Sequence, residues 1–236
     1  MATQRPLIVG HRGAKGLAQE NTIAGFEKAM EYDIDMIEFD IRQTKDDVLI
    51  VIHKHLRTPD GQSFVVRQTN FKDLLKYDPD IPTAEQVIQA VNRRVRLMVE
   101  IKRDVDPAPV AELIKGFLKK GWQPEDFMFN SDSYPILAYM QHELPQVERL
   151  IQGRWSGVRV TRLARKLETP YILLDQRYLW WGFVRAVSSR GFKLFTYTFP
   201  WHDKEPYNHH KAIRWLKDGI YGIVTDYPDH YAKKIK

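Results

Sequence analysis

Residues 36–53, with the sequence MIEFDIRQTKDDVLIVIH, decide the fold because two runs of strand-forming residues here carry charged side chains. Side chains alternate between the two faces of a strand, so Glu38 and Asp40 share a face with Met36. Taken alone, this pattern is typical of a half-exposed strand whose charges face water. The rest of the chain has to distinguish that interpretation from a buried site.

The connection between the two runs is short. Only the segment QTKDD separates them, whereas a parallel crossover needs about a dozen residues or more. The two runs therefore predict a β-hairpin. With Asp46 and Asp47 as a two-residue turn, the expected register places Asp40 directly opposite His53.

Along the rest of the chain, short apolar runs alternate with helix-length segments, which is typical of α/β units. Helices are expected at 20–33, 82–92 and 108–121, and the second begins with a capping box formed by Thr83 and Gln86. Besides the second hairpin strand at 48–53, strands are expected at 6–11, 35–42, 96–102, 126–130, 147–151, 170–174, 192–198 and 221–225.

Eight strands separated by helical segments predict an α/β fold of the (β/α)₈ TIM-barrel type. We expect a single domain over residues 1–236. Residues 54–81 are interpreted as a small insertion after the hairpin that ends at His53.

Composition excludes several classes of protein. The chain has 236 residues and no cysteine, so disulfide scaffolds, thiolate metal sites and thiol nucleophiles are excluded. No apolar run approaches the roughly 20 residues of a membrane-spanning helix, and the N-terminus lacks a signal-peptide pattern. We therefore expect a cytoplasmic protein without a transmembrane segment, and the sequence leaves peripheral contact with lipid open.

The net charge of +6 is compatible with several kinds of anionic partner. The basic residues are spread along the chain, and we find no basic helix or nucleic-acid motif. No nucleic-acid partner is therefore expected, and the sequence does not indicate an oligomeric state.

The pattern of the first strand recurs at 96–102, RLMVEIK, where Glu100 and Lys102 share a face late in the strand. In a (β/α)₈ barrel the carboxyl ends of the strands meet, so Glu100 is expected beside Glu38 and Asp40. Each carboxylate alone also fits a surface charge or a salt bridge. Together, three carboxylates without cysteine favour a hard oxygen site for one divalent cation, Mg²⁺ or Ca²⁺.

Two histidines and two cationic side chains are expected at the same end of the barrel. His11 and Arg12 follow the first strand, and His53 ends the hairpin. Imidazoles beside a metal suggest proton transfer, while Arg12 and Lys102 suit phosphate oxygens. This equipment predicts phosphate-ester cleavage without an organic cofactor.

The motifs GHRG, ENT, IEFDIRQTKDDVLIVIH, IPTAEQV, VEIK and GIVTDYP occur in this order between residues 10 and 228. In this order they resemble the glycerophosphodiester phosphodiesterase family, whose fold is that of the phosphatidylinositol-specific phospholipases C. The resemblance implies a small glycerophosphodiester substrate and the products sn-glycerol 3-phosphate and an alcohol. It implies the following roles: metal ligands Glu38, Asp40 and Glu100; a general acid–base pair His11 and His53; phosphate contacts Arg12 and Lys102; a site-organising Glu20.

Two departures from the family pattern are found, the first expected to remove or replace an auxiliary metal contact and the second to alter the wall that contacts the organic part of the substrate. Lys54 stands where the family usually has aspartate after the histidine, and YTFP at 197–200 replaces the usual Trp-Thr-Val-Asn. Asn21 of the ENT motif is interpreted as a cap of the first helix.

Two other functions stay open. Aromatic residues motivate a lysophospholipase D acting on lipid phosphodiesters: Trp180, Trp181, Tyr197, Phe199 and Trp201. A non-catalytic phosphate-binding module is the other alternative. The sequence also leaves open whether water or a hydroxyl of the substrate attacks the phosphorus, the latter through a cyclic phosphate.

Overall fold

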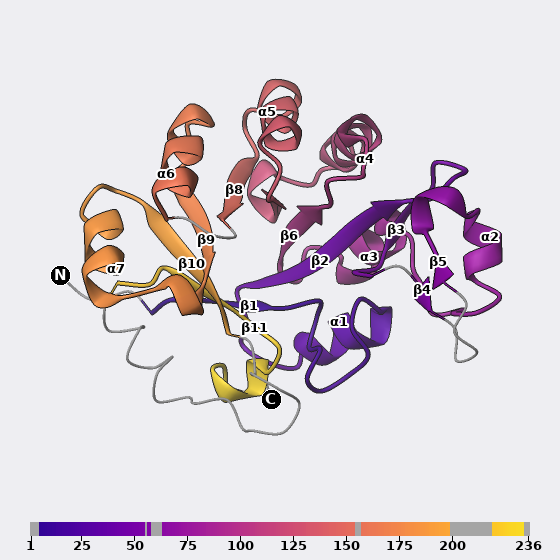
Figure 1. Ribbon diagram of the computed structural model, residues 1–236. Helices are drawn as coiled ribbons and strands as arrows, with labels where there is room; N and C mark the ends of the chain where they lie inside the picture. The colour runs from indigo at the N-terminus through magenta and orange to yellow at the C-terminus, as the bar shows by residue number, and fades with distance from the viewer. Residues whose placement is uncertain (1–4, 55, 58–62, 154–156, 199–218, 234–236) are drawn as a thin grey trace.

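The computed structural model describes residues 5–54, 56–57, 63–153, 157–198 and 219–233. Within these ranges, eight parallel strands close into a barrel in the order β1-β2-β6-β7-β8-β9-β10-β11, and β11 pairs with β1 (Figure 1). The predicted (β/α)₈ barrel is confirmed. The barrel strands are β1 Leu7–Gly10, β2 Met36–Gln43, β6 Arg96–Ile101, β7 Phe127–Ser131, β8 Glu148–Gly153, β9 Tyr171–Asp175, β10 Lys193–Thr198 and β11 Gly222–Thr225.

From β1 to β10, helices lie between successive barrel strands and cover the outside of the barrel, as Figure 1 shows for α4, α5 and α6. The capping box is confirmed, because the Gln86 amide donates to Thr83 Oγ1 and the Thr83 amide donates to Gln86 Oε1. The α-helices are α1 Ile23–Ala29, α2 Phe71–Leu74, α3 Ala84–Val91, α4 Pro107–Lys119, α5 Tyr134–Glu143, α6 Gly157–Lys166 and α7 Trp181–Ser188. Short 3₁₀ helices are Val66–Gln68, Pro124–Asp126, Gln176–Tyr178 and Pro228–His230.

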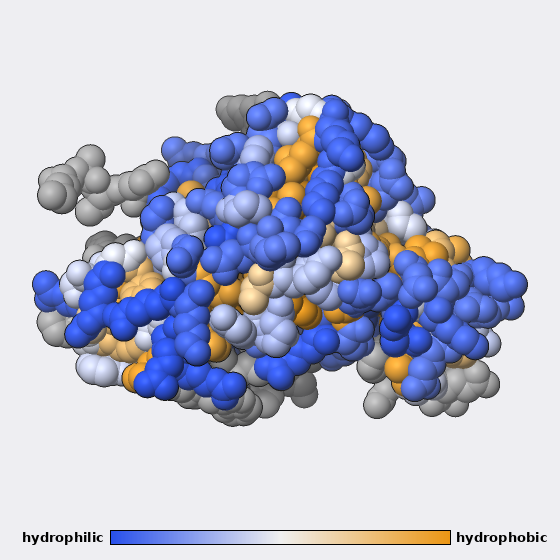
Figure 2. All heavy atoms as spheres, turned by 90° about the horizontal axis from the view of Figure 1, so that it is seen from above, coloured by the Kyte–Doolittle hydropathy of each residue, from blue (hydrophilic) through white to orange (hydrophobic). Residues whose placement is uncertain are grey.

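Among the residues described, no helix combines the length and the apolar character needed to cross a membrane. The face of the molecule seen in Figure 2 is mainly hydrophilic, with hydrophobic residues in separate small groups.

The alternation of side chains along each strand separates two cores. Residues that point outward from the strands pack against the helices, as Ile37 and Phe39 of β2 do. Residues that point inward fill the barrel, as Met36 and Met98 do. Further along the same inward-facing rows stand Glu38 and Glu100, so the interior changes from apolar to acidic toward the carboxyl ends of β2 and β6.

The predicted hairpin is present, but its expected register is wrong by one residue. β3 (Leu49–Val51) runs antiparallel to β2 with Ile41 opposite Val51. The carbonyl of Asp40 accepts from the amide of Ile52 at 3.1 Å, so Ile52 and not His53 continues the ladder beside Asp40.

A three-residue turn causes this shift. The Thr44 amide donates to the Val48 carbonyl, and the Val48 amide donates back to Thr44 Oγ1. Asp47 adopts a left-handed conformation with φ of 61°, a geometry that three-residue hairpin loops require at their last position. The pair Asp46-Asp47 is therefore only part of the turn.

The insertion after the hairpin packs beside β3, at one side of the barrel (Figure 1). Its described part includes the short strands β4 (Leu56–Arg57) and β5 (Ser63–Phe64), followed by α2. A small apolar core joins it to the hairpin through Ile50, Val66, Leu74 and Ile81.

Candidate active site

The strand order brings together seven of the eight site residues predicted from the sequence, because β1, β2 and β6 are neighbours in the barrel. Glu20, the eighth, joins them from the loop between β1 and α1. The seven are His11 and Arg12 after β1, Glu38 and Asp40 in β2, His53 after β3, Glu100 in β6 and Lys102 after β6.

The three carboxylates form a compact cluster. One oxygen each from Glu38, Asp40 and Glu100 lies within 4.8 Å of the other two. Asp40 and Glu100 are register neighbours on β2 and β6, and Glu38 and Asp40 are fully buried. Glu38 Oε1 has no hydrogen-bond partner among the described residues. Since an unpartnered buried oxygen of a charged group is costly, this donor set fits a hard divalent cation.

Two cationic side chains contact the same cluster. The Lys102 ammonium bonds both Asp40 Oδ1 and Glu100 Oε1. Arg12 Nε lies 3.1 Å from Asp40 Oδ2, and its Nη1 donates to Glu20 Oε2 at 2.9 Å. The backbone of Arg12 is left-handed, with φ of 51°, and its amide donates to Glu38 Oε2 at 2.9 Å. Arg12, in the turn after β1, therefore contacts the cluster through both its backbone amide and its side chain.

The two buried carboxyls of β2 differ in pKa. Burial raises the pKa of Glu38 well above its usual range, and the neighbouring charges of Asp40 and Glu100 raise it further. Burial also acts to raise the pKa of Asp40, but the charges of Lys102 and Arg12 outweigh it and hold this pKa below its ordinary value. Asp40 is therefore the carboxylate that the protein's own cations stabilise, whereas Glu38 depends on further positive charge.

His11 is held by an aspartate that the sequence analysis did not select. Its Nδ1 lies 2.5 Å from Oδ1 of Asp226, which directly follows β11, and both side chains are buried. Burial lowers the pKa of His11, and the hydrogen bond to Asp226 opposes this shift. The available signal was the position of Asp226 at the end of the last strand, in the motif GIVTDYP.

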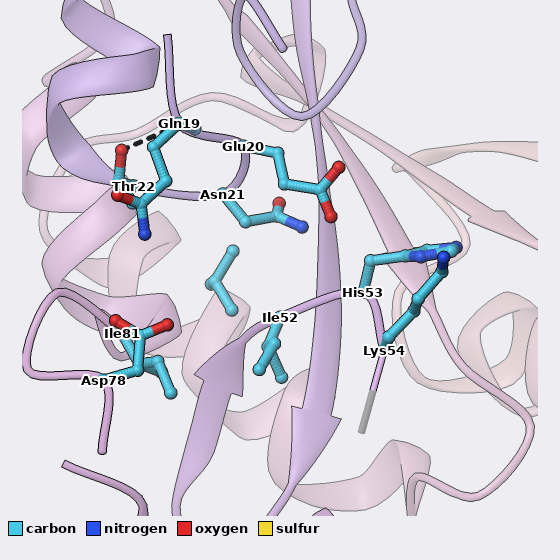
Figure 3. A pocket seen from close by; sticks show the side chains of 10 residues that line it. Gln19, Glu20, Asn21, Thr22, Ile52, His53, Lys54, Asp78 and Ile81 are labelled. Carbon is cyan, nitrogen blue, oxygen red and sulfur yellow. Dashed lines mark hydrogen bonds between the residues drawn. The ribbon is translucent and has the colours of Figure 1, made fainter. Parts of the chain in front are cut away.

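His53 stands at a pocket of about 190 Å³ (Figure 3). Glu20 and Asn21 lie across this pocket, and Lys54 lines it beside His53. His53 Nδ1 is buried without a hydrogen-bond partner among the described residues. Burial lowers the pKa of His53 to about 3, so its imidazole is neutral at physiological pH.

Asn21 does not cap the first helix, contrary to our expectation. Thr22 is the N-cap of α1, and its side chain accepts from the Gly25 amide. Asn21 Nδ2 instead donates to Asp40 Oδ2 at 2.8 Å. Its left-handed backbone, with φ of 59°, turns the side chain toward the carboxylate cluster.

Of the aromatic residues singled out in the sequence, the two whose burial the structure describes, Trp180 and Tyr197, differ in their surroundings. Trp180 is 65% exposed, whereas Tyr197 is buried inside the barrel. Trp181 belongs to α7, and Phe199 and Trp201 lie outside the described residues.

Comparisons with known proteins agree with this geometry. A glycerophosphodiester phosphodiesterase from Bacillus subtilis (strain 168) is 28% identical over 270 residues, which cover 99% of this chain and 87% of the relative. Lysophospholipase D GDPD1 from Homo sapiens is 22% identical over 267 residues, which cover 93% of this chain and 83% of the relative.

A solved structure has the same fold. It is a phosphodiesterase from Oleispira antarctica in complex with the product sn-glycerol-3-phosphate, with a TM-score of 0.79 and 22% sequence identity over 95% of this chain and 94% of the other. The model of the glycerophosphoryl diester phosphodiesterase family matches residues 11–230, which is most of the chain. The chain therefore belongs to the glycerophosphoryl diester phosphodiesterase family and is a hydrolase of phosphodiesters.

Proposed function

We propose that the protein hydrolyses glycerophosphodiesters to sn-glycerol 3-phosphate and an alcohol, using one divalent cation and the pair His11 and His53. The observation that carries the proposal is the acidic cluster of three carboxylates with two histidines and two cationic side chains around it. The names of the relatives, and the product bound to the Oleispira phosphodiesterase, support the substrate class.

Glu38, Asp40 and Glu100 would hold the cation, which is Mg²⁺ or Ca²⁺ because all donors are carboxylate oxygens. A bound cation would neutralise charge on the phosphate and on the oxygens of the developing transition state. Arg12 and Lys102 supply further positive charge that phosphate oxygens can bind, and Glu20 fixes the Arg12 guanidinium through its hydrogen bond.

The two imidazoles divide the proton transfers. One removes a proton from the attacking hydroxyl and the other delivers a proton to the leaving oxygen. Asp226 holds Nδ1 of His11, so His11 exchanges protons with the substrate through Nε2. The neutral form of His53, which burial favours, is the form that accepts a proton. The proposed roles of His11 and His53 are compatible both with attack by water and with attack by a hydroxyl of the substrate.

An activity panel tests reaction, substrate and cation together. Glycerophosphocholine, glycerophosphoethanolamine, glycerophosphoglycerol and lysophosphatidylcholine are each incubated with Mg²⁺, Ca²⁺ or chelator, and the released phosphate ester is identified. We expect sn-glycerol 3-phosphate in the presence of a cation and none with chelator. His11→Ala and His53→Ala should each lose activity by about 10²–10⁴-fold. Turnover that persists in chelator, or in both histidine variants, would contradict the proposal.

The route of attack needs a separate experiment. Hydrolysis in ¹⁸O-labelled water, stopped early, distinguishes a cyclic phosphate intermediate from direct attack by water.

Lysophospholipid hydrolysis is a second candidate, favoured by a groove whose lining is partly apolar. The groove lies between α1, α2 and α3 and has a volume of about 780 Å³. Its apolar lining includes Ile23, Phe71 and Leu75, and it shares Ile81 with the pocket beside His53. A single acyl chain suits such a surface. Faster hydrolysis of lysophosphatidylcholine than of glycerophosphocholine in the panel would select this candidate.

A further inference from the structure

Tyr197 lies at the centre of the barrel interior, where β10 passes the carboxylate cluster. It is 5% exposed, and its ring packs against His11 with a centroid distance of 5.4 Å and an interplanar angle of 58°. Its hydroxyl is 3.5 Å from Glu100 Oε2 and 3.4 Å from Gln152 Oε1. A single side chain thus contacts both a carboxylate of the cluster and one of the two histidines.

The surroundings of the hydroxyl are polar and buried. Asn130, the register neighbour of Glu100 on β7, is fully buried, and among the described residues neither atom of its amide has a hydrogen bond of ordinary geometry. The Tyr197 hydroxyl lies beside that amide. Buried polar groups without good hydrogen bonds destabilise a protein. Packing alone therefore does not explain why the Tyr197 hydroxyl and the Asn130 amide lie together inside the barrel.

The chemistry of the phenol suits a donor to Glu100. A phenol is protonated at physiological pH, since its ordinary pKa is about 10, and the Tyr197 hydroxyl lies within reach of Glu100 Oε2. A neutral phenol has one proton to donate. Donation to Glu100 Oε2 would fix the plane of a carboxylate whose Oε1 already bonds Lys102, and an oriented carboxylate binds a cation more tightly.

The ring makes the second contact. His11 is held at Nδ1 by Asp226, a contact at one edge of the imidazole. The ring of Tyr197 lies against the imidazole and limits its tilt. Small changes in the orientation of an acid–base group are expensive in rate, because proton transfer depends on distance and alignment.

We propose that Tyr197 is a positioning residue that couples the two halves of the active site: its hydroxyl orients Glu100 for the cation, and its ring orients His11. This inference rests on the proposed function, in which Glu100 binds a cation and His11 exchanges protons. Tyr197 acts through these two residues and does not itself touch the reacting atoms.

Two substitutions separate the two contacts. Tyr197→Phe removes the hydroxyl and keeps the ring, so it should weaken binding of Mg²⁺ or Ca²⁺ by about tenfold or more while kcat at saturating cation changes little. Tyr197→Leu also removes the ring, so it should additionally lower kcat at saturating cation by about tenfold or more. Cation affinity is measured by calorimetric titration of the substrate-free protein, which does not depend on turnover.

Tyr171 provides a matched control. It is another buried tyrosine of the barrel interior, on β9, but its hydroxyl bonds Glu148, which begins β8 at the opposite end of the barrel. Tyr171→Phe removes the hydroxyl of a tyrosine with similar overall burial and should lower the free energy of unfolding without changing cation affinity. If both phenylalanine variants weaken cation binding equally, the effect is a general loss of packing and the proposal is wrong.

A double-mutant cycle tests the route through Glu100. If Tyr197 acts by orienting Glu100, then Tyr197→Phe combined with Glu100→Gln should bind the cation no more weakly than Glu100→Gln alone. Additive losses would overturn the proposal. An active wild-type protein whose Tyr197→Phe variant keeps its cation affinity within twofold overturns only this inference. A wild-type protein that neither binds a cation nor hydrolyses the panel overturns the proposed function and this inference with it.

Discussion

Replacing Lys102 by methionine tests whether the acidic cluster needs a cation to stay folded. The Lys102 ammonium bonds two carboxylates, one of them fully buried, and its own side chain is 14% exposed. Breaking a buried ion pair by removing one partner costs about 3–5 kcal/mol. In chelator, Lys102→Met should therefore lower the free energy of unfolding by about this amount, measured by urea denaturation.

Addition of a divalent cation should restore most of the free energy of unfolding that Lys102→Met loses. At a concentration of 100 times its Kd, a ligand that binds only the folded state stabilises it by about 2.7 kcal/mol. A cation at the three carboxylates supplies the charge that methionine cannot, and in the variant it does not compete with an ammonium for oxygens of Asp40 and Glu100. Lys102→Met should therefore bind Mg²⁺ or Ca²⁺ more tightly than the wild-type protein, although its phosphodiesterase activity falls.

Lys115 is the matched control for this experiment. Its ammonium also contacts two carboxylates, Glu112 and Glu143, but on the outer surface, where Glu112 is 70% exposed. Because exposed ion pairs contribute about 0–1 kcal/mol, Lys115→Met should change stability little and independently of the cation. Equal losses in the two variants, or a Lys102→Met variant insensitive to the cation, would refute the charge argument.

Three further predictions concern individual hydrogen bonds and charges. Asp226→Asn should lower kcat by about 10²–10⁴-fold, because the amide no longer fixes the tautomer of His11; cation affinity measured on the same protein should not change. Asn21→Gly keeps the left-handed backbone accessible but removes the hydrogen bond to Asp40, so urea denaturation should show a loss of about 1.5–3 kcal/mol, and a loss below about 0.5 kcal/mol would count against it. Glu38→Gln replaces a buried carboxyl whose ionisation is unfavourable without a cation and whose Oε1 has no hydrogen-bond partner among the described residues, so the protein in chelator should gain about 0.5–2 kcal/mol of stability while calorimetry shows loss of cation binding.

The carboxylate cluster could be predicted from the sequence because it follows from two local rules. The period-two alternation put Glu38 and Asp40 on one face of their strand, and the same pattern put Glu100 on the corresponding face of its own. Because the two strands are parallel neighbours in the barrel, their carboxyl ends lie side by side, which brings the three carboxylates together. No knowledge of the intervening residues was required, so the prediction survived uncertainty about the helices.

The hairpin register could not be predicted in the same way, because it depends on backbone conformation within the turn. The sequence Asp46-Asp47 is compatible with a two-residue turn. The structure instead uses a left-handed Asp47 and a hydrogen bond from Val48 to the Thr44 hydroxyl. The longer turn shifts the register by one residue, so Ile52 rather than His53 lies opposite Asp40. Such a shift exchanges the faces on which the side chains of a strand lie relative to its partner.

The role of Asp226 depends on closure of the barrel. It is separated from His11 by 215 positions in the sequence, and the two meet only because β11 pairs with β1. Asn21 was interpreted as a helix cap because asparagine is typical of that position. In the structure Thr22 caps the helix, and the left-handed conformation of Asn21 directs its amide to Asp40. Long-range pairings and positive φ angles leave little trace in local pattern.

The charges of the site suit the proposed combination of a divalent cation with a phosphodiester substrate. In the ionised form that a bound cation would favour, the three carboxylates exceed the charges of Arg12 and Lys102 by one, and a phosphodiester, itself an anion, would be repelled by that excess. A divalent cation reverses the sign to one positive charge, which a singly charged phosphodiester then neutralises. A monovalent cation would leave the cluster neutral and the bound complex negative. Because the site is buried, where screening by salt is weak, this balance favours a divalent cation over a monovalent one independently of coordination geometry.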